Sequence, residues 1–164
     1  MPRKIPTKTR MKHRLDKAVR NYVKARDNYC CQTCGIHKDS TPLGQLDWSH
    51  KISRGHLVLR WDERNTISQC RKCHNDWGKG ITKPMNMAID RLFGEGTAQL
   101  LENMARQHPV SKGTYLDLVE FRMKLEDYYK KKRTLVLEQG YTQQECIANL
   151  YTDFGLKIKG TMDE

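Results

Sequence analysis

Four cysteines form two pairs with the spacing of a metal site. Cys31 and Cys34 are separated by two residues, and Cys70 and Cys73 repeat that gap. Two thiolates at this spacing can bind one ion, and four complete the closed tetrahedral shell of structural zinc. In a reducing compartment such pairs are more often metal ligands than disulfides. The spacing therefore predicts a structural Zn²⁺ site.

Two histidines near these pairs could carry out hydrolysis. His50 lies between the pairs, and its ordinary pKa near 6.5 suits a general base that takes a proton from water. His74 directly follows Cys73, so a zinc site would fix its direction. A rigidly held imidazole suits a ligand for a catalytic cation such as Mg²⁺ or Mn²⁺. These residue types favour metal-dependent cleavage of a phosphodiester.

The arrangement of the cysteine pairs around His50, Asn65 and His74 resembles the HNH endonucleases, whose core is a ββα-metal (His-Me finger) fold. Within that group, the segments 49–57 and 59–70 are similar to the NinG/Rap recombination endonucleases of lambda-like phages. The resemblance implies that His50 is the general base and that the Asn65 amide ties the loop together and orients it. It also implies branched or recombination DNA as substrate and the cytoplasm of an infected bacterium as location.

One position departs from the HNH pattern. Many of these enzymes carry an acidic metal ligand directly before the base, where this chain has Ser49. A hydroxyl is a poor ligand for a hard cation compared with a carboxylate. Asp47, Asn75 and Asp62 are the candidates for a further ligand beside His74, although strand periodicity directs Asp47 away from His50.

The elements that position these groups follow from the local patterns. Residues 47–52 are predicted to form a strand, and residues 57–61 alternate well enough for its return strand. Residues 65–69 are interpreted as a bridge to the second cysteine pair, and a short helix is expected from Cys73. The fold class is α+β, with this zinc-bound core between a basic helix and a helical extension.

Three regions are expected along the chain. Residues 1–29 are a basic arm and a helix that starts near His13, residues 30–83 are the zinc-bound HNH core, and residues 84–164 are the helical extension. In the extension, apolar residues at steps of three and four predict helices that end near Gly94, before Pro109 and at Gly140, followed by a short helix with a capping box. These apolar stripes, with Cys146, are interpreted as core; a homodimer interface is the alternative.

The charge balance indicates a polyanionic partner. The net charge is +11 and the pI is about 9.5, values typical of proteins that bind nucleic acid. No apolar run reaches the roughly 20 residues of a membrane span, and no secretory leader is recognisable, so a cytoplasmic protein is expected. The candidate DNA contacts are Arg54, Arg60, Arg64, Arg71, Lys72, Lys79, Lys130, Lys131, Lys132 and Arg133.

Two other interpretations remain open at this point. A zinc-ribbon protein that binds DNA without cleaving it would also explain the cysteines and the charge, and Ser49 favours it. An RNA-binding zinc module fits the charge, but the sequence offers no motif for a base-stacking sheet.

Overall fold

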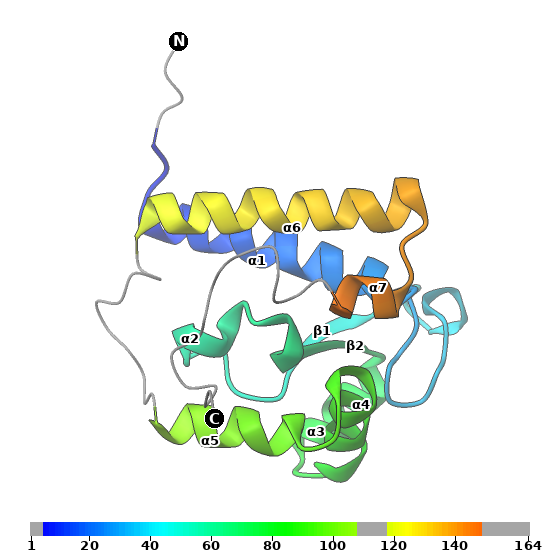
Figure 1. The fold of residues 1–164 in the computed structure, drawn as a ribbon. Coiled ribbons are helices and arrows are strands. Elements are labelled where there is room, and N and C mark those ends of the chain that lie inside the picture. Colours follow the sequence, from blue (N-terminus) through cyan, green and yellow to red (C-terminus); the bar gives the residue numbers. More distant parts are fainter. Residues whose placement is uncertain (1–4, 108–117, 149–164) are drawn as a thin grey trace.

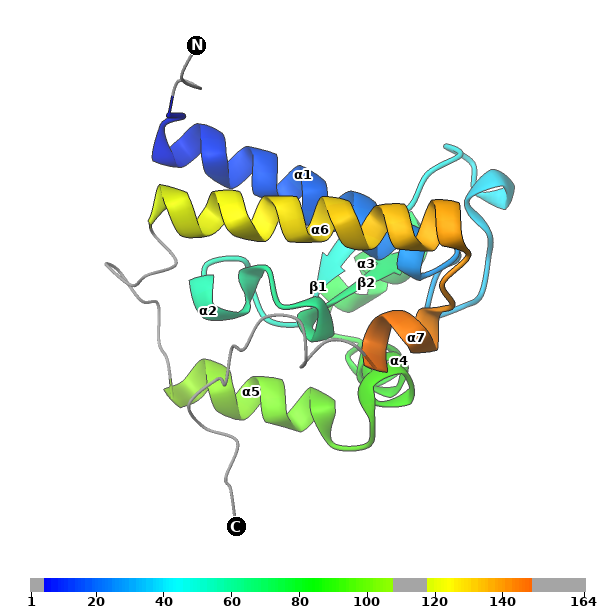
Figure 2. The ribbon, with the colours of Figure 1, turned by 45° about the horizontal axis from the view of Figure 1, so that its top comes forward.

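The computed structural model describes residues 5–107 and 118–148, which form an α+β, mostly helical fold around a small two-stranded sheet (Figure 1). The sheet lies between two helical layers in both ribbon views (Figures 1 and 2). One layer is α1 (Lys8–Arg26) with α6 (Val119–Gln139). The other contains α4 (Lys83–Phe93) and α5 (Thr97–Gln107). Among the described helices, none combines the length and the apolar character needed to cross a membrane.

Helix α1 begins earlier than its apolar pattern predicts. Thr7 caps it, because its Oγ1 accepts a hydrogen bond from the Arg10 N–H at 3.3 Å, and Met11 in the second turn is fully buried. The interpretation of the first dozen residues as a flexible arm is therefore wrong for residues 8–12. The cap supplies the start signal that the apolar spacing alone does not contain.

Helices α1 and α6 run in the same direction, although they are far apart in the sequence. Arg14 of α1 pairs with Glu126 of α6 at 2.9 Å. Further along both helices, the rings of Tyr22 and Tyr129 lie 5.5 Å apart. Their apolar sides form a first buried cluster, which also contains Trp61 and Cys146. The core interpretation is confirmed for Leu125 and Cys146 and for the buried residues of α4 and α5, whereas Leu118 and Leu100 are 58% and 39% exposed.

The two strands pair in antiparallel register, from Asp47 opposite Gln69 to His50 opposite Thr66. Strand β1 covers Asp47–His50 and β2 covers Thr66–Gln69. The predicted return strand over residues 57–61 is wrong, because those residues form the single-turn helix α2 (Leu57–Arg60) and the following Trp61. The bridge predicted over residues 65–69 contains the true return strand.

The packing explains why residues 57–60 form a helical turn and residues 66–69 form the return strand. The helical turn lets Leu57 and Val58 pack against the α1–α6 cluster while Leu59 enters a second cluster with α4 and α5. Strand β2 is buried on both faces, and polar partners from α1 hold it: the Arg26 guanidinium donates to the Thr66 carbonyl and Asp27 accepts from the Ser68 N–H. Its sequence therefore lacks an apolar alternation.

The remaining elements follow the sequence closely. Helix α3 (Arg71–Gly78) starts at the second cysteine pair, and the 3₁₀ turns η1 (Lys38–Ser40) and η2 (Glu63–Asn65) shape the loops on either side of β1. Gly94 and Gly140 end α4 and α6 with positive φ values of 104° and 69°. Helix α7 (Gln143–Ala148) has the predicted capping box. The predicted extension also includes residues 108–117 and 149–164, which lie outside the described residues.

Candidate functional site

The four predicted cysteines meet at one point. The sulfurs of Cys31, Cys34, Cys70 and Cys73 all lie within 4.8 Å of one another. The Sγ atoms of Cys34 and Cys70 are 3.8 Å apart, which is far beyond a disulfide bond. Zinc–sulfur bonds of about 2.3 Å in a tetrahedron place the sulfurs about 3.8 Å apart. The cluster could thus hold a structural metal such as zinc.

Local hydrogen bonds prepare the cysteine cluster. Gly35, with a φ of +80°, makes the tight turn after Cys34. Burial opposes ionisation of Cys31, but nearby backbone N–H groups outweigh burial and lower the pKa of its thiol. Burial and the neighbouring thiols instead raise the pKa of Cys73. A bound metal would supply the positive charge that this second thiolate needs.

The first cysteine loop is fastened to the sheet. The backbone N–H of Gln32 donates to the Ser68 carbonyl at 2.8 Å, and the Gln69 amide donates to Thr33 Oγ1 at 2.7 Å. Because Cys70 follows β2 directly and is the residue before α3, the cluster joins the first loop, the sheet and α3. The cysteine cluster therefore links the direction of α3 to that of β1.

His50 ends β1 and its ring is held in one tautomer. Its Nε2 lies 3.0 Å from the Arg60 carbonyl oxygen, which can only accept, so Nε2 carries the proton and Nδ1 keeps the lone pair. The Trp77 indole donates to the His50 carbonyl at 3.1 Å. Burial, with a smaller repulsion from Arg54 and Arg60, lowers the pKa of His50 to about 4. The imidazole is therefore neutral at physiological pH.

Asn65 ties together the loop that carries Arg60. It is fully buried, and its Oδ1 accepts from the Ile52 N–H at 2.8 Å. Its Nδ2 donates to the carbonyls of Ile52 at 3.1 Å and Leu59 at 2.9 Å. One side chain thus joins the end of the first strand to α2 and holds the segment that orients the His50 ring.

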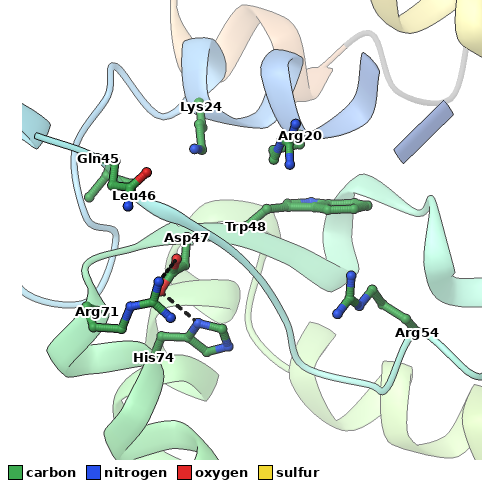
Figure 3. Close-up of a pocket in the computed structure, with 9 residues that line it drawn as sticks. All are labelled: Arg20, Lys24, Gln45, Leu46, Asp47, Trp48, Arg54, Arg71 and His74. Carbon is green, nitrogen blue, oxygen red and sulfur yellow. Dashed lines mark hydrogen bonds and ion pairs between the residues drawn. The ribbon is translucent and has the colours of Figure 1, made fainter. Parts of the chain in front are cut away.

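His74 and Asp47 meet beside a cleft of about 220 Å³ (Figure 3). Asp47 Oδ2 lies 3.0 Å from His74 Nδ1, and its Oδ1 is 3.2 Å from the Arg71 guanidinium. Two neighbouring ligands in an octahedral shell with bonds of about 2.1 Å are themselves about 3.0 Å apart. The Asp47–His74 distance matches this spacing but is also that of an ordinary hydrogen bond, and among the described residues only the four cysteines gather three or more possible metal ligands.

Ser49 takes the position of the expected acidic ligand, and the carboxylate on the same strand is that of Asp47, two residues earlier. Ser49 is fully buried and its hydroxyl has no hydrogen-bond partner among the described residues. Asp47 lies three positions before His50 on β1, so strand periodicity directs the two side chains to opposite faces. Asp47 and Trp48 both line the cleft, and the Trp48 ring lies 4.2 Å from the His50 ring between centroids. His50 is not among the residues that line the cleft, so the structure does not bring it together with the Asp47–His74 pair there.

Cations surround the cleft from three elements. Arg71 comes from α3, Arg54 from the loop after β1, and Arg20 and Lys24 reach down from α1 (Figure 3). Burial and repulsion by Arg20 lower the pKa of Lys24. The predictions included Arg54 and Arg71 but missed Arg20 and Lys24, whose spacing of four residues on a helix was the available signal.

Three of the predicted DNA contacts form ion pairs within the protein. Arg60 binds Asp16 through two nitrogens at 2.9 and 2.7 Å. Arg64 is buried beside Asp62. Lys132 is buried and donates to Glu63 at 2.9 Å and to the Cys146 carbonyl at 3.0 Å. We correct these three assignments, because each charge is neutralised by an internal partner.

The other candidates are divided between the cleft and the surface. Asp62 caps η2 and pairs with Arg64, and Asn75 is exposed on α3 away from the lining residues, so neither joins Asp47 and His74. Five of the predicted DNA contacts are exposed and lie outside the cleft lining: Lys72, Lys79, Lys130, Lys131 and Arg133. Of these, Lys72 pairs with Asp76 and Lys130 with Glu126.

Comparison of the chain with protein-family models, curated proteins and solved structures returned no match.

Proposed function

We propose that this chain is a metal-dependent DNA endonuclease of the HNH type. The observation that carries the proposal is the Asp47–His74 pair at a cationic cleft, together with a neutral, oriented His50 whose ring contacts Trp48, a residue that lines the cleft. The order of β1, β2 and α3, with His50 on the first strand and His74 on the helix, agrees with the ββα layout expected from the resemblance. The endonuclease class follows from these groups, and branched DNA follows from the resemblance alone.

His50 acts as the general base. Because Nε2 donates to the Arg60 carbonyl, Nδ1 is free to accept a proton from the attacking water. Asn65 keeps that carbonyl in place through the bond to Leu59, its neighbour in the chain. A pKa of about 4 keeps the base unprotonated across the physiological range.

Asp47 and His74 hold the divalent cation. A bound Mg²⁺ or Mn²⁺ supplies charge neutralisation at the phosphate and at the departing 3′ oxygen. An imidazole among the ligands suits Mn²⁺ better than Mg²⁺, because Mg²⁺ prefers oxygen donors. Arg54 and Arg71 bind neighbouring phosphate oxygens and fix the position of the strand.

The proposal is tested by cleavage of a panel of linear duplex, fork, D-loop and four-way junction DNA, with Mg²⁺ or Mn²⁺ added. We expect nicking of at least one branched substrate. His50→Ala should lose about 10²–10⁴-fold in rate, the usual contribution of a general base, while its DNA affinity stays unchanged. His37→Ala, at a half-exposed histidine in the first cysteine loop, is the control. Cleavage by His50→Ala at the wild-type rate would exclude His50 from the reaction.

A second function is a zinc-containing DNA-binding protein without catalysis. The Arg71–Asp47 ion pair favours it, because a guanidinium already neutralises the carboxylate that would bind the cation. Under this function the wild type binds branched DNA but cleaves none of the panel with either metal. If the protein only binds DNA, Arg71→Gln also cleaves none of the substrates. If the protein is an endonuclease, Arg71→Gln lowers the metal concentration needed for the half-maximal cleavage rate.

A further inference from the structure

A line of basic residues follows one face of α1. Its members are spaced by three or four residues, so they share one side of the helix. We call this set the α1 stripe, and it consists of Arg10, His13, Lys17, Arg20 and Lys24. All but the partly buried Lys24 are exposed, while the apolar face of the same helix is buried against α6.

The α1 stripe leads away from the cleft. Arg20 and Lys24 line it beside Asp47 and His74, and Arg10 lies at the far end of the helix. With a rise of 1.5 Å per residue, the stripe extends about 21 Å. Duplex DNA carries one phosphate per about 1.7 Å of its axis, so a segment of this length passes about twelve phosphates.

The α1 stripe lacks ion pairs in the part of the chain that the structure describes, although the Asp47 carboxylate attracts Lys24. None of its four Lys and Arg side chains forms an ion pair there, whereas Arg14 on another side of α1 pairs with Glu126. Like charges on successive turns destabilise a helix, so the sequence maintains an unfavourable arrangement that an external polyanion relieves. A membrane surface fits less well, because a helix that lies in a bilayer interface needs an accessible apolar face.

We infer that the α1 stripe binds the phosphate backbone of the nucleic acid that extends beyond the cleft. The cleft then holds the strand to be cut, and the stripe fixes the direction in which the flanking duplex leaves. The identity of the cleft as a cleavage site rests on the proposed function; the binding role of the stripe does not.

The decisive variant is Arg10→Gln with Lys17→Gln, because these two residues lie outside the cleft. Both are exposed, and glutamine retains helix propensity. Lys83→Gln with Arg106→Gln removes the same charge from exposed positions on α4 and α5, in the opposite helical layer (Figures 1 and 2). All proteins carry His50→Ala, and helix content by circular dichroism and zinc content establish that each is folded.

The measurement is the dissociation constant of a fluorescent 20-base-pair duplex over a series of salt concentrations. Each lost phosphate contact reduces the slope of log affinity against log salt by about 0.9 for duplex and about 0.7 for single strands. We expect a reduction of about 1.8 for the stripe variant on duplex and none for the control. Equal slopes for both variants would overturn the inference, as would loss of binding to anionic phospholipid vesicles with unchanged binding to DNA.

The two proposals fail in different ways. Suppose that the protein with His50 intact cleaves DNA, but the stripe variant has the same salt dependence of DNA binding as its unsubstituted reference. The binding role of the α1 stripe is then wrong and the proposed endonuclease function stands. If no substrate is cut but the slope falls as expected, the endonuclease is wrong and the stripe remains a nucleic-acid surface.

Discussion

Asp47 Oδ2 lies 3.0 Å from His74 Nδ1, which joins the start of β1 to the second turn of α3 across 27 residues. Neither residue is close to the other in sequence, and the turn of α3 that carries His74 begins at a cysteine of the metal cluster. The contact therefore depends on the cluster and on the pairing of the two strands together.

Asp47→Asn should keep the fold and remove the charge that would bind the cation under the proposed function. We expect the cleavage rate to fall by at least about 100-fold at fixed metal concentration, since even outer-shell partners of metal ligands account for about 10–100-fold. The rate is measured on the best substrate of the DNA panel over a Mn²⁺ titration. Asp39→Asn, in η1 with a side chain 74% exposed, is the matched control. A wild-type metal titration for Asp47→Asn would show that the cation binds elsewhere.

Purified protein should contain about one zinc per chain. Cys70→Ser removes a buried ligand of the cluster, so we expect it to lose the metal and to unfold at lower temperature. Cys30→Ser is the control, because the Cys30 thiol donates only to the Asn28 carbonyl and is no member of the cluster. Zinc is measured by elemental analysis and the unfolding temperature by circular dichroism. Full zinc content in Cys70→Ser would remove that residue from the site.

Lys132→Met should destabilise the protein strongly. The change leaves the buried Glu63 carboxylate without its cation from α6, and breaking a buried ion pair costs about 3–5 kcal/mol. The neighbouring Lys131 is exposed, so Lys131→Met should change the free energy of unfolding by less than about 0.5 kcal/mol. Urea unfolding of both variants measures the difference. Similar values for the two would mean that Arg26 and Tyr22, which also contact Glu63, neutralise it on their own.

Stability should depend on the protonation of His50. Burial lowers its pKa to about 4 in the folded protein, below the ordinary value of about 6.5. The unfolded chain therefore binds a proton between pH 6.5 and 4 that the folded protein does not. The contribution of His50 to the free energy of unfolding is therefore complete above pH 6.5. It is lost as the pH falls to 4, and the total loss is at most about 3 kcal/mol. His50→Gln should show a shallower fall in unfolding free energy between pH 7 and 5 than the wild type; parallel curves would contradict the prediction.

Features encoded by short-range spacing could be predicted from the sequence. The paired cysteines, the glycines that end α4 and α6, and the capping box of α7 each depend on residues within a few positions of one another. His50 and His74 were singled out by residue type near the cysteine pairs, and Asn65 by the resemblance to the HNH endonucleases. The structure gives His50 and Asn65 the hydrogen bonds that hold a ring and a loop.

Features that depend on distant partners could not be predicted. Strand β2 is polar because Arg26 and Asp27 from α1 satisfy its backbone, so no alternation revealed it. The sequence indicated that Lys132 lies at an exposed helix end. In the structure it pairs with Glu63, which is 69 residues away in the chain. Periodicity disfavoured Asp47 because it points away from the His50 face, and its contact with His74 depends on the packing of α3, which the spacing along β1 does not encode.

The Lys132–Glu63 contact also bears on the order of folding. Glu63 begins the 3₁₀ turn that contains Asn65, and its second partner is the buried hydroxyl of Tyr22 on α1. Contacts this far apart in the sequence form late, after the entropy of closing a long loop has been overcome. During synthesis, the segment around Asn65 therefore lacks one of its buried counter-ions until residue 132 has been added, although all four cysteines of the cluster precede that residue.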